Sequence, residues 1–186
     1  LVDVSDRETA NINLLTHLEF DRVYYLVTRE HKTVKQAKKQ AQAEIFNAFH
    51  IDTTGIESSA EDLDVFGKTD ADAALLAISI MLQGDGSETD LSVLLTEIAN
   101  DMETDGKWDG PGSDSIRAAL ADSALSKDEQ GMFAIYRSNV RGWGLSTTVP
   151  YFEKYIRKFA SIENGLSVCG DKNNPVGTVK RVSNPK

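Results

Sequence analysis

Apolar residues recur along most of the chain with the three- and four-residue spacing of amphipathic helices. Seven segments carry this pattern: 11–29, 33–50, 70–83, 87–102, 113–124, 126–142 and 150–159. The third segment is apolar on nearly every side, which is typical of a helix buried on most of its surface. The pattern predicts an all-α fold, a compact bundle of about seven helices with residues 74–82 and 91–102 at its centre.

Residues that favour helix N-termini precede most of these segments. The candidate caps are Thr33, Thr69, Ser87, Ser113 and Ser126. Thr33 and Ser126 are also followed, three residues later, by the Gln or Glu that completes a capping box. Pro150 suits the first position of the last helix. Gly84 and Gly86 break the apolar pattern, so we expect the third and fourth helices to form a helical hairpin.

The helical pattern covers the middle of the chain and stops near both ends. The chain opens with Leu1 rather than Met, so we expect it to be a segment of a longer protein, with residues 1–10 as a linker from a preceding domain. Residues 11–160 form the helical domain, within which a polar surface loop is pinned by Phe66. In residues 161–186 valines stand among Gly, Asn and Pro, which predicts an irregular or extended tail or the start of a β-rich domain.

The formal net charge of −9 is distributed unevenly. Residues 51–130 carry 4 basic and 19 acidic side chains, whereas residues 131–186 carry 9 basic and 3 acidic ones. An acidic middle repels phosphate, so we expect no nucleic-acid partner. We expect instead that helices of the acidic middle lie beside helices of the basic end, where Lys154, Arg157 and Lys158 face outward.

An acidic turn between two predicted helices is the best candidate for a metal site. Its carboxylates are Asp101, Glu103, Asp105 and Asp109. Their alternation, with Gly106 at the sixth place, matches the first half of an EF-hand calcium loop. The twelfth place is Gly112 rather than the bidentate Glu, so a regular EF-hand does not result. Calcium is therefore a possible cofactor here, and a solvated turn at a helix end is the alternative.

The same turn contains Trp108, beside Asp109 and Gly110. Because its neighbours are polar, we expect this indole to be exposed, where it could stack on a sugar ring. The acidic turn, residues 101–109, thus supports one hypothesis from the class of binding modules, a site for calcium or polysaccharide. Packing in the core is the ordinary use of tryptophan and remains the alternative.

Three further groups of polar residues could support chemistry, although no nucleotide-binding loop, nucleophile elbow or metal tetrad is present. Glu97 lies one helical turn before Asp101, so the two could act as the acid and base of a glycan or peptide hydrolase. His17 and Asp21 are also one turn apart, but a partly buried, hydrogen-bonded histidine is the simpler interpretation. The last group is Asp62, Asp64, Asp70 and Asp72, in which two carboxylates suit the first turn of a helix without any metal.

Several strings of the sequence resemble a known bacterial family. They are NINLLTHLEFDRVYYLV, AKKQAQAEIFNAF, DLDVFGKTDADAALLAISIMLQG and LLTEIANDMETDGKWD. Together they resemble the helical domain of large surface lipoproteins and secreted multidomain proteins of Fibrobacter and related bacteria, over about residues 10–160. The string GLSVCGDKNNPVGTVKRVSNP resembles the opening of the small cysteine-containing domain that follows in such proteins.

The resemblance implies an exported protein of the cell envelope or the extracellular space, with a lipid anchor upstream as its only connection to a membrane. It implies no reaction and supplies no catalytic residues. With the missing catalytic motifs, it favours a non-catalytic structural or interaction module whose partners are neighbouring domains of the same chain, or an extracellular protein or polysaccharide. Cys169 is the only cysteine, and export would let it form a disulfide with a cysteine outside this segment.

Overall fold

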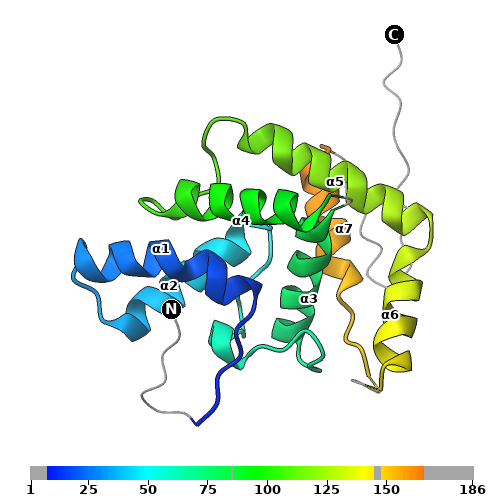
Figure 1. Ribbon diagram of the computed structural model, residues 1–186, viewed down its shortest axis with the longest axis horizontal. Coiled ribbons are helices and arrows are strands. Elements are labelled where there is room, and N and C mark those ends of the chain that lie inside the picture. Colours follow the sequence, from blue (N-terminus) through cyan, green and yellow to red (C-terminus); the bar gives the residue numbers. More distant parts are fainter. Residues whose placement is uncertain (1–7, 85, 145–147, 166–186) are drawn as a thin grey trace.

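The computed structural model describes residues 8–84, 86–144 and 148–165. Those residues form seven α-helices and one 3₁₀ turn, with no strand among them, so the all-α prediction is confirmed (Figure 1). The elements are α1 (Leu14–Thr28), α2 (Val34–Ala48), η1 (Ala60–Asp62), α3 (Asp70–Gln83), α4 (Glu88–Met102), α5 (Ser113–Glu129), α6 (Met132–Gly142) and α7 (Glu153–Glu163). The predicted extended tail and Cys169 lie outside the described residues.

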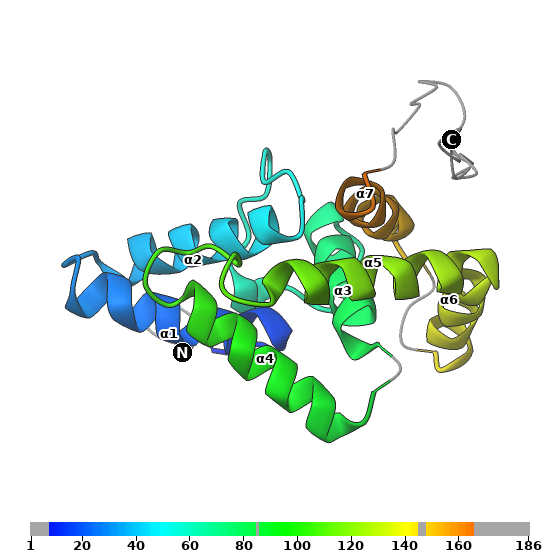
Figure 2. The same cartoon turned by 90° about the horizontal axis from the view of Figure 1, so that it is seen from above.

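The helices pack as two groups that share one continuous core. Helix α1 packs on α2 and is crossed by α4, while α7 packs on α3 and α5, and α6 leans on α5 (Figures 1 and 2). Helix α3 is buried on most sides, as its sequence predicts, with Leu75 and Ile78 fully covered. The aromatic residues Phe152 and Phe159 close this core from the side of α7.

Three predicted capping residues begin their helices as expected. Thr33, Thr69 and Ser87 each form a capping box with the residue three positions later, whose side chain accepts from the backbone N–H of the cap. The first helix begins later than the pattern of residues 11–29 predicts. Asn13 is its N-cap, and its Oδ1 accepts from the backbone N–H of Thr16 at 3.1 Å.

The capping predictions at Ser113 and Ser126 are wrong. Ser126 lies inside α5, which continues to Glu129, and the break comes at Gly131, whose φ of 71° is a left-handed conformation that ends the helix. Ser113 is the first residue of α5, and Gly112 is its N-cap. A Ser with a Glu three residues later is equally compatible with an exposed helix interior, so the pattern alone could not distinguish the two cases.

The start predicted at Pro150 is also wrong, because α7 begins three residues later at Glu153. The backbone before it is held by Arg137 of α6, which donates to the carbonyls of Val149 and Pro150 and to the carboxylate of Glu153. In the same stretch the backbone N–H of Phe152 donates to the carbonyl of Pro150 at 2.9 Å, so these residues form a tight turn before the helix rather than its first turn.

The predicted hairpin of α3 and α4 does not form a packed pair. Helix α4 leaves α3 after the glycine break and crosses α1 instead (Figure 1). Its C-terminal part is buried in the core through Ile98, Ala99 and Met102. Its first half is only partly covered: Val93 is 52% exposed, and the residues that pack against the core from this side, Leu91, Leu94 and Leu95, are half-buried. The prediction of a central position is therefore right for α3 and wrong for the first half of α4.

Two features of the surface complete the fold. The loop after α2 is anchored by Leu63, which is fully buried, and also by Phe66, which is half-buried and packs against the core as expected.

The expected neighbourhood of the acidic middle and the basic end is confirmed. Lys154 Nζ of α7 lies 2.7 Å from Asp70 Oδ1 of α3, and Arg157 Nε of α7 lies 2.6 Å from Asp128 Oδ2 of α5.

Candidate functional site

The carboxylates of the acidic turn shape the turn itself. Asp101 Oδ2 accepts from the backbone N–H of Gly110 at 2.9 Å, and Asp105 Oδ1 accepts from that of Lys107 at 3.0 Å. Glu103 is half-buried, and Asp109 is exposed. In the part of the chain that the structure describes, no three His, Cys, Asp or Glu side chains are placed to hold a metal together. Calcium binding here stays a prediction.

Trp108 is buried, contrary to the expectation that it is exposed. Its residue exposure is 4%, and its ring lies 5.5 Å from that of Phe49 between centroids. The guanidinium of Arg117 on α5 lies 5.9 Å from the Trp108 ring and donates to its backbone carbonyl. The polar neighbours of Trp108 in sequence gave no sign of these contacts, which come from α2 and α5. Its faces are covered by protein, so they do not offer a stacking surface for a sugar.

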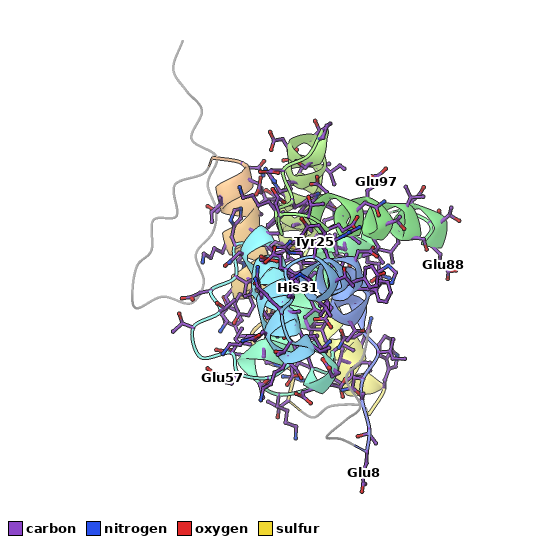
Figure 3. The ribbon with its side chains drawn as sticks, turned by 90° about the vertical axis from the view of Figure 1, so that its left-hand side faces the viewer. Glu8, Tyr25, His31, Glu57, Glu88 and Glu97 are labelled. Atoms are coloured by element: carbon purple, nitrogen blue, oxygen red, sulfur yellow. The ribbon has the colours of Figure 1, made fainter. Side chains whose placement is uncertain are left out.

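The hydrolase candidates do not share an enclosed site. Glu97 is exposed on α4 and points away from the body of the protein (Figure 3), whereas Asp101 is engaged by Gly110. His17 is exposed, so the expectation of a partly buried histidine is wrong. A histidine that does contact a carboxylate is His50, whose Nε2 lies 2.6 Å from Glu163 Oε1.

The group of four aspartates serves helix starts and ion pairing. Asp72 accepts from the backbone N–H groups of Thr69 and Asp64, both at 2.9 Å. Asp62 caps the 3₁₀ turn, and Asp70 pairs with Lys154. These contacts favour the interpretation that needs no metal.

The sequence analysis missed a buried ionic cluster between α1, α2 and η1, which we call the buried triad: Glu19, Lys38 and Glu61. The side chains of Glu19 and Glu61 are fully covered, and that of Lys38 is 6% exposed. The Lys38 ammonium donates to Glu19 Oε1 and lies 3.1 Å from Glu61 Oε2. Burial raises the pKa of Glu19 to about 7, against the lowering effect of its hydrogen bond with Lys38. Because one ammonium group faces two carboxyl groups, the carboxyl group of Glu19 tends to keep its proton near neutral pH.

A signal for the buried triad was present in the spacing. Glu19 stands in the same helical stripe as Leu15 and Val23, and Lys38 stands beside Ala37 and Ala41. Lys38 and Gln42 are polar residues that would ordinarily lie on the outer face of α2, but both are at least 94% buried. Charges of opposite sign in the apolar stripes of two consecutive helices are the pattern that would have revealed them.

A second ion pair, between buried Arg22 and half-buried Glu44, holds the acidic turn from inside. Arg22 of α1 donates from Nε and Nη2 to the Glu44 carboxylate at 2.7 and 2.9 Å, and from Nη1 to the Thr104 carbonyl at 2.6 Å. The hydrogen bonds with Glu44 raise the pKa of Arg22. Gly106 approaches the same carboxylate so closely that an added Cβ would lie 2.2 Å from Glu44 Cδ. Arg22 therefore fixes the backbone of the turn rather than leaving it adaptable.

A cavity of about 630 Å³ opens between α2 and the loop that follows it. Lys35, Lys39 and Gln42 line it from α2, and the loop residues 53–59 line it from the other side. Lys38 and Glu61 of the buried triad also reach its wall. Figure 3 shows Glu57 at the outer edge of this loop. One side of the cavity is thus formed by the loop that the sequence predicts to be a polar surface loop.

Comparison with known protein families, with curated proteins and with solved structures finds no match for this chain. In the described part of the chain, none of the helices combines the length and the apolar character needed to cross a lipid bilayer.

Proposed function

We propose that this chain is a non-catalytic structural or interaction module of an exported, lipid-anchored bacterial surface protein, in which it holds neighbouring domains. The exported setting rests on the resemblance to Fibrobacter-type lipoproteins. The non-catalytic role is supported by one observation above all. Several polar side chains with catalytic potential already have structural partners: Asp72 caps α3, Asp101 accepts from the backbone of Gly110, and Glu163 pairs with Arg117.

The positions of Glu8 and of the C-terminal end of α7 support a spacer in particular. Glu8 lies at the bottom of Figure 3, whereas the C-terminal end of α7 lies at the top of Figures 1 and 3. A rigid body with its ends on opposite sides sets a fixed separation between whatever is attached to them. The ion pairs of Lys154 and Arg157 with α3 and α5 would help to keep α7 in place.

A distance measurement between the two ends tests the spacer. Spin labels at Thr9→Cys and Ile162→Cys, in a Cys169→Ser background, should give one narrow distance distribution by pulsed electron paramagnetic resonance. A broad distribution from a protein that remains helical would contradict a rigid spacer. Labels at Ser92→Cys and Ile162→Cys provide a control pair within the fold.

A turnover screen tests the non-catalytic role. We expect no turnover of a panel of glycans and peptides beyond that of the buffer. Turnover that disappears in Glu97→Gln, but persists in Glu88→Gln on the same exposed helix, would overturn the proposal in favour of a hydrolase. Both glutamates are exposed on α4 (Figure 3), so the two variants differ only in position.

A further inference from the structure

The cavity between α2 and the following loop has the size of a small-molecule site. Its volume of about 630 Å³ falls within the range of about 300–1,000 Å³ that is usual for ligand pockets. One wall is a single helical face, formed by Lys35, Lys39 and Gln42. The other wall is the backbone and side chains of residues 53–59, which include two threonines and two serines.

The wall of the cavity contains polar side chains that the protein already holds in position. Lys38, Gln42 and Glu61 are each at least 94% buried. Lys38 is held between the two carboxylates of the buried triad, and Gln42 Nε2 donates to the carbonyl of Ser58 at 2.9 Å. Because only the amide nitrogen of Gln42 is used in this bond, its Oε1 stays available as an acceptor. A ligand would therefore meet a wall that needs little rearrangement.

The charges around the cavity cancel. Three lysines line it, and the three acidic residues Glu57, Glu61 and Asp62 line it as well. Five of these six residues, all but Lys35, are also engaged with one another or with the loop. Lys39 lies 3.7 Å from Glu57, and Asp62 accepts from the hydroxyl of Ser59 at 2.6 Å. A site without surplus charge gives a phosphate, a carboxylate or a cation little electrostatic advantage.

The remaining groups suit a ligand that both donates and accepts hydrogen bonds. The Lys35 ammonium and the threonine hydroxyls of the loop can donate, while the Gln42 amide oxygen and loop carbonyls can accept. Ala43, Phe46 and Ile56 add apolar surface to the same cavity. Neutral sugars present both kinds of surface, since their hydroxyls lie around the ring and their C–H groups lie on its faces.

We propose that this cavity binds a neutral polyhydroxylated ligand of the size of a mono- or disaccharide. The inference goes beyond the spacer role and is independent of it, because a rigid spacer could lack a ligand and a flexible module could bind one. It also uses a site distinct from the acidic turn, residues 101–109.

The test is a titration of the isotopically labelled chain, followed by the chemical shifts of its backbone amides. The probes are glucose, xylose, galactose, cellobiose and maltose, each raised to about 50 mM, well above the about 1 mM Kd of a weak ligand. Inorganic phosphate, acetate and methylammonium serve as charged comparators. We expect saturable shifts from at least one sugar, confined to residues 42–43 and 53–59 and absent with the charged probes.

Two variants locate the site. Ala43→Leu places a larger side chain in the cavity from α2 and should weaken sugar binding at least about tenfold. Ala119→Leu makes the same change on the exposed face of α5 and should leave binding unchanged. If Ala43→Leu loses its dispersed spectrum, Ser58→Tyr obstructs the cavity from the loop and replaces it in the test.

The outcomes separate clearly. Sugar-dependent shifts that are lost in the filled variant and kept in the control support the proposal. It is overturned if all five sugars leave the spectrum unchanged, if the shifts persist in Ala43→Leu, or if a charged probe alone saturates these residues. None of these results depends on the distance between the chain ends, so failure here leaves the spacer proposal standing.

Discussion

The interior between α1, α2 and η1 differs from the interior between α3, α5 and α7 in what it buries. The first encloses Glu19, Arg22, Lys38 and Glu61, which pair with one another or with Glu44. The second is closed by apolar side chains of the three helices. Its ion pairs are partly or largely open to water: the side chains of Arg117 and Glu163 are 20% and 12% exposed, and those of Lys154 and Asp70 are 36% and 72% exposed. Charged residues therefore form ion pairs in both regions, but the pairs of the second region are more accessible to water.

The difference matters because water changes the energy of an ion pair. A buried pair adds little net stability, since desolvation offsets the attraction, but the loss of one partner leaves an uncompensated charge in the interior. A surface pair is solvated with or without its partner. The buried triad therefore selects one arrangement of α1 against α2 and η1, whereas the pairs of α7 reinforce a position that apolar packing already defines.

Removal of the buried cation should have the largest effect. Lys38→Met leaves Glu19 and Glu61 without their ammonium, and we expect the free energy of unfolding at pH 7 to fall by about 3–5 kcal/mol. Urea denaturation measures the loss. Lys39→Met changes the neighbouring lysine, whose side chain is 77% exposed, and should cost less than about 0.5 kcal/mol. Equal losses in the two variants would contradict the difference between interior and surface.

The pH dependence of stability should come next. The folded protein raises the pKa of Glu19 from 4.5 to about 7, so it holds this proton more tightly than the unfolded chain does. Stability should therefore fall as the pH rises from about 4.5 to about 7, by up to about 3 kcal/mol from this group. In Glu19→Gln a neutral amide replaces the carboxyl group, so this position no longer titrates. Across that pH window the free energy of unfolding of the variant should therefore rise relative to that of the wild type. Free energies of unfolding, measured by urea denaturation, that change equally with pH in the two proteins would contradict the prediction.

A methyl group at the acidic turn should have a smaller effect. Gly106→Ala must move the Glu44 carboxylate, which Arg22 holds, and must adopt a φ of 73°. We expect a loss of about 2–3 kcal/mol in thermal or urea unfolding. Gly112→Ala has a similar φ of 92° but meets no atom within 4 Å, so it should cost only the backbone strain, about 1 kcal/mol. A loss in Gly106→Ala no larger than in Gly112→Ala would show that Glu44 moves freely.

The surface pair of α7 should matter least. Lys154→Ala removes the partner of Asp70, whose side chain is 72% exposed, and should cost at most about 1 kcal/mol. The cost should shrink further in about 1 M salt, where charges are screened over about 3 Å. Comparison of urea midpoints at low and high salt measures both effects. A loss as large as that of Lys38→Met, unaffected by salt, would place this pair with the buried ones.

Local patterns in the sequence were sufficient for much of the fold. The spacing of apolar residues identified all seven helices that the structure describes, and the caps at Thr33, Thr69 and Ser87 were placed correctly. These features depend on residues within about one helical turn of each other, which the sequence displays directly. The false cap at Ser126 shows the limit, since the same local pattern occurs within a continuous helix.

The candidate site depended on contacts that the local patterns do not contain. Trp108 is buried by Phe49 and Arg117, which are distant in sequence, although its neighbours are polar. Single charged residues such as Glu19 and Lys38 usually face solvent, and the second carboxylate of the cluster comes from a third helical element that is distant in sequence. The cavity likewise requires a loop whose path is set by Leu63 and by its contacts with α2.

The positions of Glu8 and of the C-terminal end of α7 have a mechanical consequence. Helix α7 runs toward the top of Figure 1 and is seen along its axis in Figure 2, so tension between Glu8 and the end of α7 would act largely along that axis. Such a force loads the contacts of α7 with α3 and α5 in shear, and many of them must break together rather than one after another. The fold should therefore resist stretching through its ends better than peeling of α7 sideways.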